Sequence, residues 1–242
     1  MNFFSGIAYN LRGLGMGLRT PKLLLLGLIR IVAVIILTIL AASLILVYHQ
    51  EILALMWAKP ESRWILWLWH VFSWFLSLVL VGLSAVISYL VSQILFSVVI
   101  MDQMSKITEK KITGQVKESH NIPWLRQFFY LIKQEIPRAT IPVLLILFLT
   151  LAGWLTPFGP IVALISTGLA MIFLAWDNTD LTPARRLEPF KMRFNRLMSN
   201  LPFHLGFGIL FIIPGLNILF LSFAPVGATL YFIEKQNAPN KL

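Results

Sequence analysis

Long apolar runs separated by short polar segments are the main pattern along the chain. The first run lies within residues 22–48, and Arg30 is its only charge after Lys22. The second lies within residues 64–113, opens with a cluster of tryptophans and continues in helical pattern up to Gly114, a residue type that often ends helices. Because each run exceeds the ~18 apolar residues of a membrane span, we expect two long transmembrane helices.

Two later runs share a different pattern, in which an apolar arm is followed by a proline–glycine break and a second apolar arm. They cover residues 141–176 and 201–233. Each arm has about 13–18 residues, or ~20–27 Å of helix, which is short for a ~30 Å hydrocarbon core. We therefore predict two partly penetrating, re-entrant hairpins, with two full spans joined by tight outer turns as the alternative. Their structural tips are Pro157, Gly159, Pro160, Pro214 and Gly215.

Two further segments have the period of amphipathic helices. Phe4, Ile7, Leu11, Leu14 and Leu18 recur at three- and four-residue steps, so residues 1–21 are predicted to form an interfacial helix, whose glycines allow close approach to other backbone. Residues 122–136 are predicted to form a helix along the membrane surface. The pattern as a whole predicts an all-α integral membrane protein with a single membrane domain, residues 1–242.

Composition and charge support this class. The chain is 58% hydrophobic, above the 45–50% of soluble domains, and has no cysteine, which excludes disulfides and thiolate metal sites. The net charge of +10 concentrates in the N-terminal segment, in residues 102–140 and 177–200, and in the tail. The positive-inside rule places these segments together on the cytoplasmic side of a multi-pass protein.

Basic residues supply the candidate binding chemistry. Arg12, Arg19 and Lys22 precede the first span and could hold an anion, since arginine offers a planar fork of donors. Binding of lipid headgroups, with a role in topology, is the alternative. Arg30 either reaches the interface along its own helix or serves as a pathway or partner charge within the membrane.

Other candidates concern the pathway and its gating. Arg185 and Arg186 could attract or gate anions, or simply form a solvated basic loop; Asn217, just after a helix break, could satisfy freed backbone groups or line a path. The sequence has no HExxH motif, no Walker loop and no clustered metal ligands. We therefore expect no enzyme activity, no cofactor and no metal.

The segment from Phe207 to Glu234 carries a specific resemblance. Its Ile-Pro-x-Leu-Asn and Gly-Ala-Thr elements resemble those of the CysZ family of bacterial inner-membrane sulfate permeases, grouped with the etoposide-induced-protein-like membrane proteins. The matching residues are Ile213, Pro214, Leu216, Asn217, Gly227, Ala228 and Thr229. The resemblance implies two long spans with two penetrating hairpins, homo-oligomers, and uptake of sulfate across the inner membrane for cysteine synthesis.

The chain departs from this family after Pro21. The resemblance implies a Gly-Leu-Arg-Arg-like anion-binding stretch there, but Pro21 is followed by Lys22 and a run of leucines, while Gly17-Leu18-Arg19 lies on the other side of the proline. We therefore expect a divergent member: an inner-membrane transporter of sulfate or a related small anion, in contact with membrane lipids and without nucleic-acid partners. The alternatives are a transporter of a different anion and a non-transporting membrane scaffold.

Overall fold

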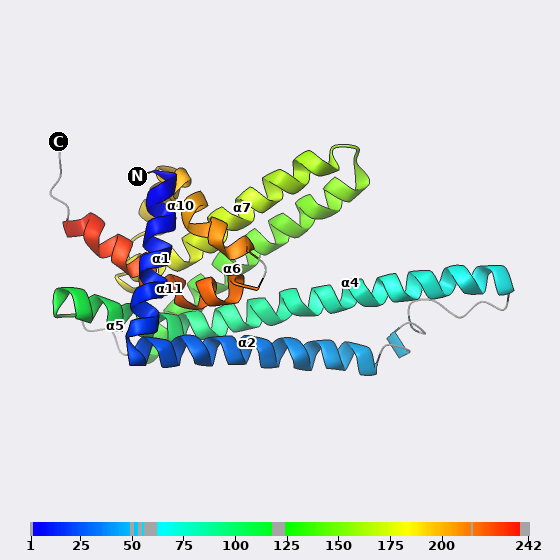
Figure 1. Ribbon diagram of the computed structural model, residues 1–242, viewed down its shortest axis with the longest axis horizontal. Coiled ribbons are helices and arrows are strands. Elements are labelled where there is room, and N and C mark those ends of the chain that lie inside the picture. Colours follow the sequence, from blue (N-terminus) through cyan, green and yellow to red (C-terminus); the bar gives the residue numbers. More distant parts are fainter. Residues whose placement is uncertain are drawn as a thin grey trace. The chain divides into compact units, whose positions relative to one another are not determined.

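All regular structure in the described part of the chain is helical. The structure, a computed structural model, describes residues 2–48, 51–52, 55, 62–117, 124–213 and 215–237 (Figure 1). The helices are α1 (Phe3–Arg19), α2 (Pro21–Val47), α4 (Arg63–Phe96), α5 (Asp102–Thr113), α6 (Trp124–Leu155), α7 (Gly159–Thr179), α8 (Leu181–Arg185), α9 (Phe190–Met198), α10 (Leu201–Gly208) and α11 (Asn217–Asn237), with a π-helical turn η1 (Ser97–Met101) and a 3-10 turn η2 (Ile209–Ile212).

Four of these helices are long and apolar enough to cross a membrane. They are α2, residues Ile65–Ser84 of α4, α7, and residues Asn217–Lys235 of α11. The all-α membrane fold class is therefore confirmed, whereas the partial penetration of the two hairpins stays a prediction.

The predicted second span is continuous but not uniform. α4, η1 and α5 follow one another without a gap, and Gly114 ends α5 with a φ of 78°, which is the left-handed conformation that favours glycine. The π-helical turn η1 lies at the transition from the apolar α4 to the polar α5. The predicted end of this long helix at Gly114 is thus confirmed.

The predicted surface helix at residues 122–136 is not separate from the first hairpin. α6 runs from Trp124 to Leu155 through Pro137 and Pro142, joining the surface segment to the arm that begins at residue 141. Proline removes one helix hydrogen bond and can kink a helix without ending it. A boundary placed between these two segments was therefore wrong.

The described chain divides into two compact units, one formed by residues 2–31 and 94–237 and the other by residues 32–93. The second unit contains the later part of α2 and nearly all of α4. A stripe of buried serines at positions 73, 77, 84 and 88 follows one face of α4, and the Ser88 hydroxyl donates to the Leu37 carbonyl of α2 at 3.3 Å. Small hydroxyl residues of this kind allow membrane helices to pack closely.

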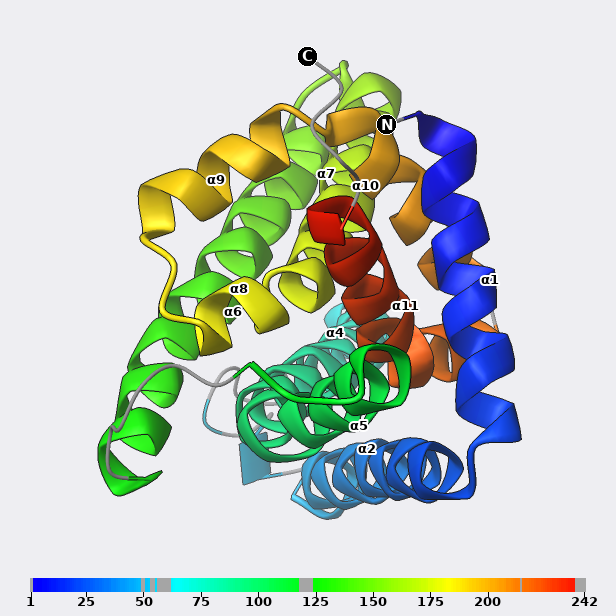
Figure 2. The ribbon, with the colours of Figure 1, turned by 90° about the vertical axis from the view of Figure 1, so that its left-hand side faces the viewer.

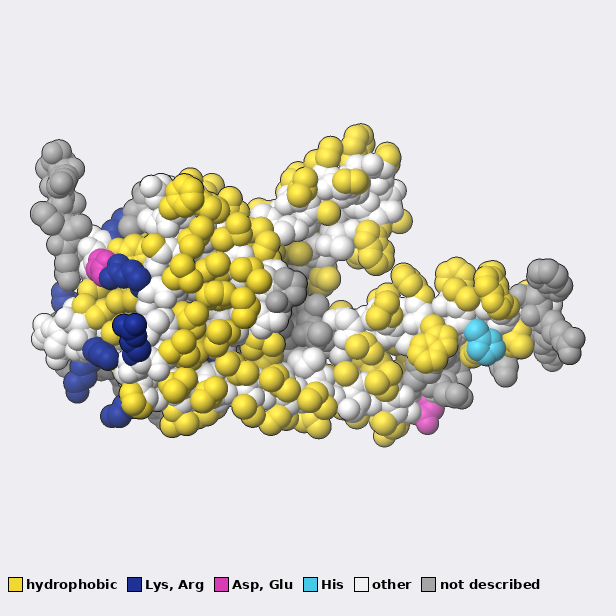
Figure 3. Space-filling view, viewed as in Figure 1, with side chains coloured by type: hydrophobic (Ala, Val, Ile, Leu, Met, Phe, Trp, Pro, Cys, Tyr) yellow, Lys and Arg dark blue, Asp and Glu magenta, His cyan; other side chains and the backbone are white. Residues whose placement is uncertain are grey.

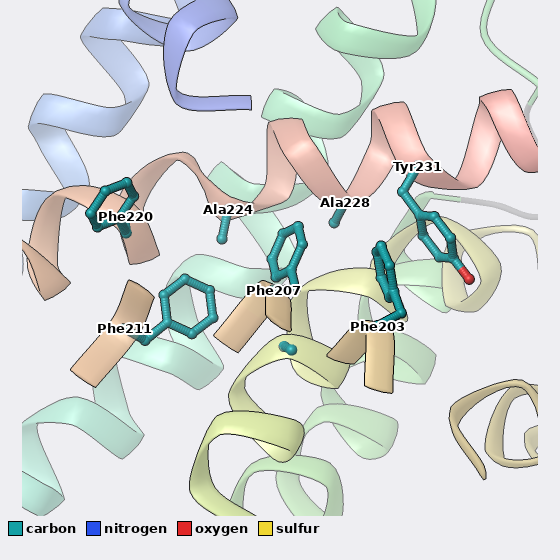
Figure 4. Packing of buried hydrophobic residues seen from close by; sticks show 8 residues of the cluster. Phe203, Phe207, Phe211, Phe220, Ala224, Ala228 and Tyr231 are labelled. Atoms are coloured by element: carbon teal, nitrogen blue, oxygen red, sulfur yellow. The ribbon is translucent and has the colours of Figure 1, made fainter. Parts of the chain in front are cut away.

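The first unit is built around α11. Phenylalanines from α10 and η2 pack against one side of this helix (Figure 4), where Phe203 stacks on Tyr231 with ring centroids 4.0 Å apart. Phe207 and Phe211 continue the contact along Ala224 and Ala228. The second proline-broken run, residues 201–233, is therefore a folded core in which its two arms cover each other.

α1 lies alongside α11 and α10 (Figure 2) and packs through its glycines. The buried positions of α1 are Gly6, Asn10, Gly13 and Gly17, and a side chain on Gly13 would overlap the backbone of Gly227. The predicted close approach to other backbone is confirmed at Gly6 and Gly13, whereas Gly17 lies against the Phe223 side chain and Gly15 faces open space. The predicted apolar stripe instead remains largely exposed, with Phe4, Leu11 and Leu18 at its surface, as expected for a helix that contacts lipid.

The predicted breaks coincide with the ends of helices. Residues 156–158 form the turn between α6 and α7, with Pro157 exposed, and Gly159 and Pro160 open α7, where proline needs no donor. Gly215 has a φ of 79° between η2 and α11. Pro214, the remaining predicted tip residue, lies outside the described residues.

Candidate functional site

A basic cavity of about 420 Å³ opens between α1, α5 and α11. It is lined by three cationic side chains together with small and apolar groups: Arg12, Gly15, Met16, Arg19, Thr20, Lys111 and Leu230. Among the described residues, no acidic side chain lines it. Figure 3 shows Lys and Arg side chains gathered where α1 and α5 lie, beside the hydrophobic surface of α1. The cavity combines positive charge with room for a hydrated small anion.

The cationic residues of the cavity come from two helices. Arg12 and Arg19 are seven residues apart on α1, so they share one face of that helix. Lys111 comes from α5 and donates to the Thr20 hydroxyl at 2.8 Å, which holds its ammonium at the cavity. Sequence reasoning found both arginines but missed Lys111, which is one of several basic residues in a polar segment.

Arg12 has a carboxylate partner at the rim. Its guanidinium forms a two-pronged contact with Glu234 of α11, with Nη1 donating to Oε2 at 3.0 Å and Nη2 donating to Oε1. The Tyr9 hydroxyl also donates to Glu234 Oε2, at 2.7 Å. Glu234 was not among the predicted site residues, since nothing in the sequence connects it to Arg12, 222 residues away.

Lys22, the third predicted anion ligand, is exposed at the start of α2 and does not line the cavity. Its neighbour Leu23 is fully buried and packs with Met104 and Phe223. The second position after Pro21 therefore contributes to the core in this chain, while the first stays exposed.

Arg30 is buried at 4% exposure and donates from Nη1 to the carbonyl of Leu221 at 2.7 Å. Leu221 lies four residues before Pro225, the proline inside α11, which has no N–H to offer that carbonyl. An unsatisfied carbonyl is costly in a membrane interior. Of the two interpretations of Arg30, the geometry favours a partner charge within the protein.

Arg185 and Arg186 meet in a buried ion-pair centre. The side chains of Arg185 and Glu109 are each 1% exposed and hydrogen-bonded to each other. Asp102 lies 3.4 Å from Arg185, and Arg186 donates to Glu109 at 2.6 Å. α5 and the end of α8 thus bring opposite charges together inside the protein, where each needs its partner.

A cluster of three buried hydroxyl groups lies next to the ion-pair centre, and two of them are on the same helices, α5 and α8. The Oγ of Ser105 in α5 lies 3.0 Å from Thr182 Oγ1 of α8 and 2.9 Å from Thr229 Oγ1 of α11, and all three side chains are at most 2% exposed. Hydroxyls of this type can link membrane helices at low steric cost. The polar interior of the first unit is therefore built from α5, α8 and α11 together.

Asn217 begins α11, and its side-chain oxygen accepts from the backbone N–H of Ile218 at 2.9 Å. It belongs to neither the basic cavity nor the ion-pair centre. Its geometry agrees with the interpretation that it satisfies backbone groups at the helix break.

Comparison with known proteins identifies the family. The family described as sulfate transporter CysZ/etoposide-induced protein 2.4 matches residues 9–230. The chain belongs to this family. No curated protein matches it.

The Gly-Ala-Thr element of the CysZ resemblance has a packing role in the structure. Gly227 lies against the backbone of Tyr9 and Asn10, Ala228 is in the aromatic core, and Thr229 joins the hydroxyl cluster. The family pattern in α11 therefore specifies how this helix packs against α1, α5 and α10. The cationic side chains of the basic cavity come instead from α1 and α5.

Proposed function

We propose that this protein is a multi-pass permease of the bacterial inner membrane that admits sulfate, or a closely related small anion, for sulfur assimilation and cysteine synthesis. Membership of the CysZ family supports the transport class. The observation that carries the substrate class is the cavity that joins Arg12, Arg19 and Lys111 without an acidic lining residue among those described.

The cavity offers the donors that a tetrahedral oxyanion needs. Arginine supplies a planar fork that can bind two oxygens, and lysine supplies a compact point charge. The Thr20 hydroxyl lies beside Lys111 and adds a neutral donor. The anion would gather at this basic surface, which we place on the cytoplasmic side from the charge distribution.

We assign the ion-pair centre a different part in this proposal. Arg185 and Arg186 are already engaged by Glu109, so an anion would have to compete with a buried carboxylate to reach them. This arrangement supports a structural or gating role for the two arginines. Since no nucleotide-binding motif occurs in the sequence, transport would be passive or coupled to an ion.

Uptake of labelled sulfate into liposomes containing the purified full-length protein tests the proposal. Arg19→Gln and Lys111→Gln should each reduce uptake or binding about tenfold, the loss expected for one charge-assisted hydrogen bond. Lys110→Gln is the matched control: it removes the same charge from the neighbouring exposed residue of α5, which does not line the cavity. Equal effects of all three variants would contradict a specific site.

The alternatives give different results in the same experiment. A transporter of another anion would show uptake that unlabelled sulfate does not compete for. A non-transporting scaffold would show neither uptake nor sulfate binding, and its loss from cells would leave growth on sulfate unchanged. The proposed homo-oligomer is checked separately by measuring the mass of the protein in a lipid nanodisc.

A further inference from the structure

We propose that Glu234 is a built-in competitor for the anion at Arg12, and that it sets both the affinity and the charge selectivity of the basic cavity. The inference rests on the proposed function, because it describes how the same cavity would choose its ligand. It assigns a specificity-determining role to a residue that does not itself line the cavity.

The first argument is chemical similarity. A carboxylate presents two oxygens to the guanidinium fork, and a sulfate can present two oxygens to the same fork. Glu234 occupies both Nη1 and Nη2 of Arg12. Arg12 lies at the cavity with its anion-binding edge already filled, so a ligand that uses this edge must displace Glu234.

The second argument concerns the strength of the contact. The side chains of Arg12 and Glu234 are 51% and 37% exposed. Exposed ion pairs contribute little to stability because water and salt screen them. The pair is therefore weak enough for a ligand to break. The buried pair of Arg185 and Glu109 contrasts with it, since each of those side chains is only 1% exposed.

The third argument is that Glu234 keeps a partner after displacement. The Tyr9 hydroxyl donates to its Oε2 at 2.7 Å. Burial, followed by the hydrogen bond to Glu234, raises the pKa of the Tyr9 phenol above its ordinary value, so this donor stays protonated at physiological pH. The carboxylate can release Arg12 while remaining hydrogen-bonded.

Selectivity follows from the charge balance. With Glu234 in place, Arg12 is neutralised and the cavity presents Arg19 and Lys111, a charge of +2 that matches a dianion. A monovalent ion such as chloride gains less from these charges and cannot replace both prongs of the Arg12 contact. Glu234 should therefore weaken binding of every anion, and that of monovalent anions most.

The test is a sulfate titration of the full-length protein in lipid nanodiscs, with and without chloride as competitor. Glu234→Gln should tighten sulfate binding about fivefold, the factor expected when an exposed ion pair is removed, and should make binding more sensitive to chloride. Glu234→Asp keeps the charge but shortens the side chain, so its sulfate affinity should lie between those of the wild type and Glu234→Gln. This variant controls for an effect of the new amide group.

Glu188→Gln is the matched control, because Glu188 also pairs with an arginine, Arg196, but neither residue lines the cavity. If Glu188→Gln tightens binding as much as Glu234→Gln, net charge explains the effect and the inference is overturned. Unchanged or weaker binding by Glu234→Gln, together with weaker binding by Arg19→Gln, overturns this inference alone. If neither the wild type nor any variant binds sulfate, the proposed function fails, and the inference fails with it.

Discussion

The two proline-broken segments of this chain have the same sequence pattern and different structural roles. In the first segment, 17% of the apolar 18-residue stretch of α7 is buried inside the protein. In the second segment, 72% of the corresponding stretch of α11 is buried. The hairpin of α6 and α7 therefore presents most of its apolar surface outward. α11 forms the centre of the first unit, with α1, α5 and α7 against it and the phenylalanines of α10 packed on its side chains.

The difference teaches that hydropathy locates a helix in the membrane but does not determine its packing. Lipid tails are as apolar as leucine, so burial between membrane helices depends on small and hydroxyl residues that allow close contact. α11 has Ala224, Gly227, Ala228 and Thr229 at such contacts. In α7, large residues such as Leu164 and Ile165 remain exposed.

The largest expected difference between the two segments concerns a glycine-to-alanine substitution in α11, at Gly227, and one in α7, at Gly168. In Gly227→Ala the new Cβ would lie 2.5 Å from the Tyr9 carbonyl, so α1 and α11 must move apart. We expect a loss of about 2–3 kcal/mol of stability, as in overpacked cores, visible as a clear drop in Tm in detergent. Gly168→Ala in α7 meets no atom within 4 Å and should be neutral or slightly stabilising.

A result in which both alanine variants lose stability equally would contradict the distinction between the two segments. Gly13→Ala provides a second check from the α1 side, because its Cβ would overlap the backbone of Gly227. Gly13→Ala should lose about as much stability as Gly227→Ala. The double variant should lose less than the sum of the two single losses, because both changes crowd the same contact between α1 and α11.

Several helix ends and turns could be predicted from the sequence because they depend on short-range preferences of glycine and proline. The end of the long second helix at Gly114 and the turns near Pro160 and Gly215 depend on the conformational preferences of one or two residues. The failure at α6 has another origin: the change from a polar amphipathic segment to an apolar run was taken as a boundary, although α6 continues through both.

The candidate site could be predicted only where its members are near in sequence. Arg12 and Arg19 share a helix face, and the periodicity of α1 indicates this directly. Lys111 and Glu234 reach the same place through the packing of α5 and α11 against α1. Such contacts depend on tertiary structure, so charge alone could not distinguish Lys111 from its basic neighbours or join Glu234 to Arg12.

A smaller loss of stability is expected from a change near Pro225, because the prolines of the two segments occupy different helix positions. Pro225 lies inside α11, and Arg30 donates to the carbonyl that this proline leaves free; Pro160 lies in the first turn of α7, where no donor is required. Arg30→Leu should cost about 2 kcal/mol, the penalty for a buried carbonyl without a partner. In a Pro225→Ala background, the new N–H can bond Leu221, and this cost should fall by about 1 kcal/mol.

Denaturation of the four proteins of this cycle in detergent gives the coupling directly. The same cycle with Pro160→Ala in place of Pro225→Ala is the control and should show none. Additive effects of Arg30→Leu and Pro225→Ala would mean that Arg30 is held by its other contacts, and that the prolines of the two segments are equivalent after all.

The mildest perturbation compares the two hairpin tips. The chain contains no cysteine, so single cysteines can be introduced without background. Thr156→Cys at the first tip and Leu216→Cys at the second both replace exposed side chains and should leave stability unchanged. If the hairpins are re-entrant from the cytoplasmic side, a membrane-impermeant maleimide added outside intact cells should label neither tip.

Two positions calibrate this labelling. Ser62→Cys lies between the first two spans; the positive-inside rule predicts that this loop is on the side opposite the basic segments, so it should react from outside. Lys110→Cys, in the basic segment after the second span, should react only after permeabilisation. Labelling of Thr156→Cys from outside would show that α6 and α7 cross the membrane completely. If Leu216→Cys then stayed protected, the more exposed hairpin would be a pair of full spans and the buried one a re-entrant core, so that the difference in packing would extend to the topology itself.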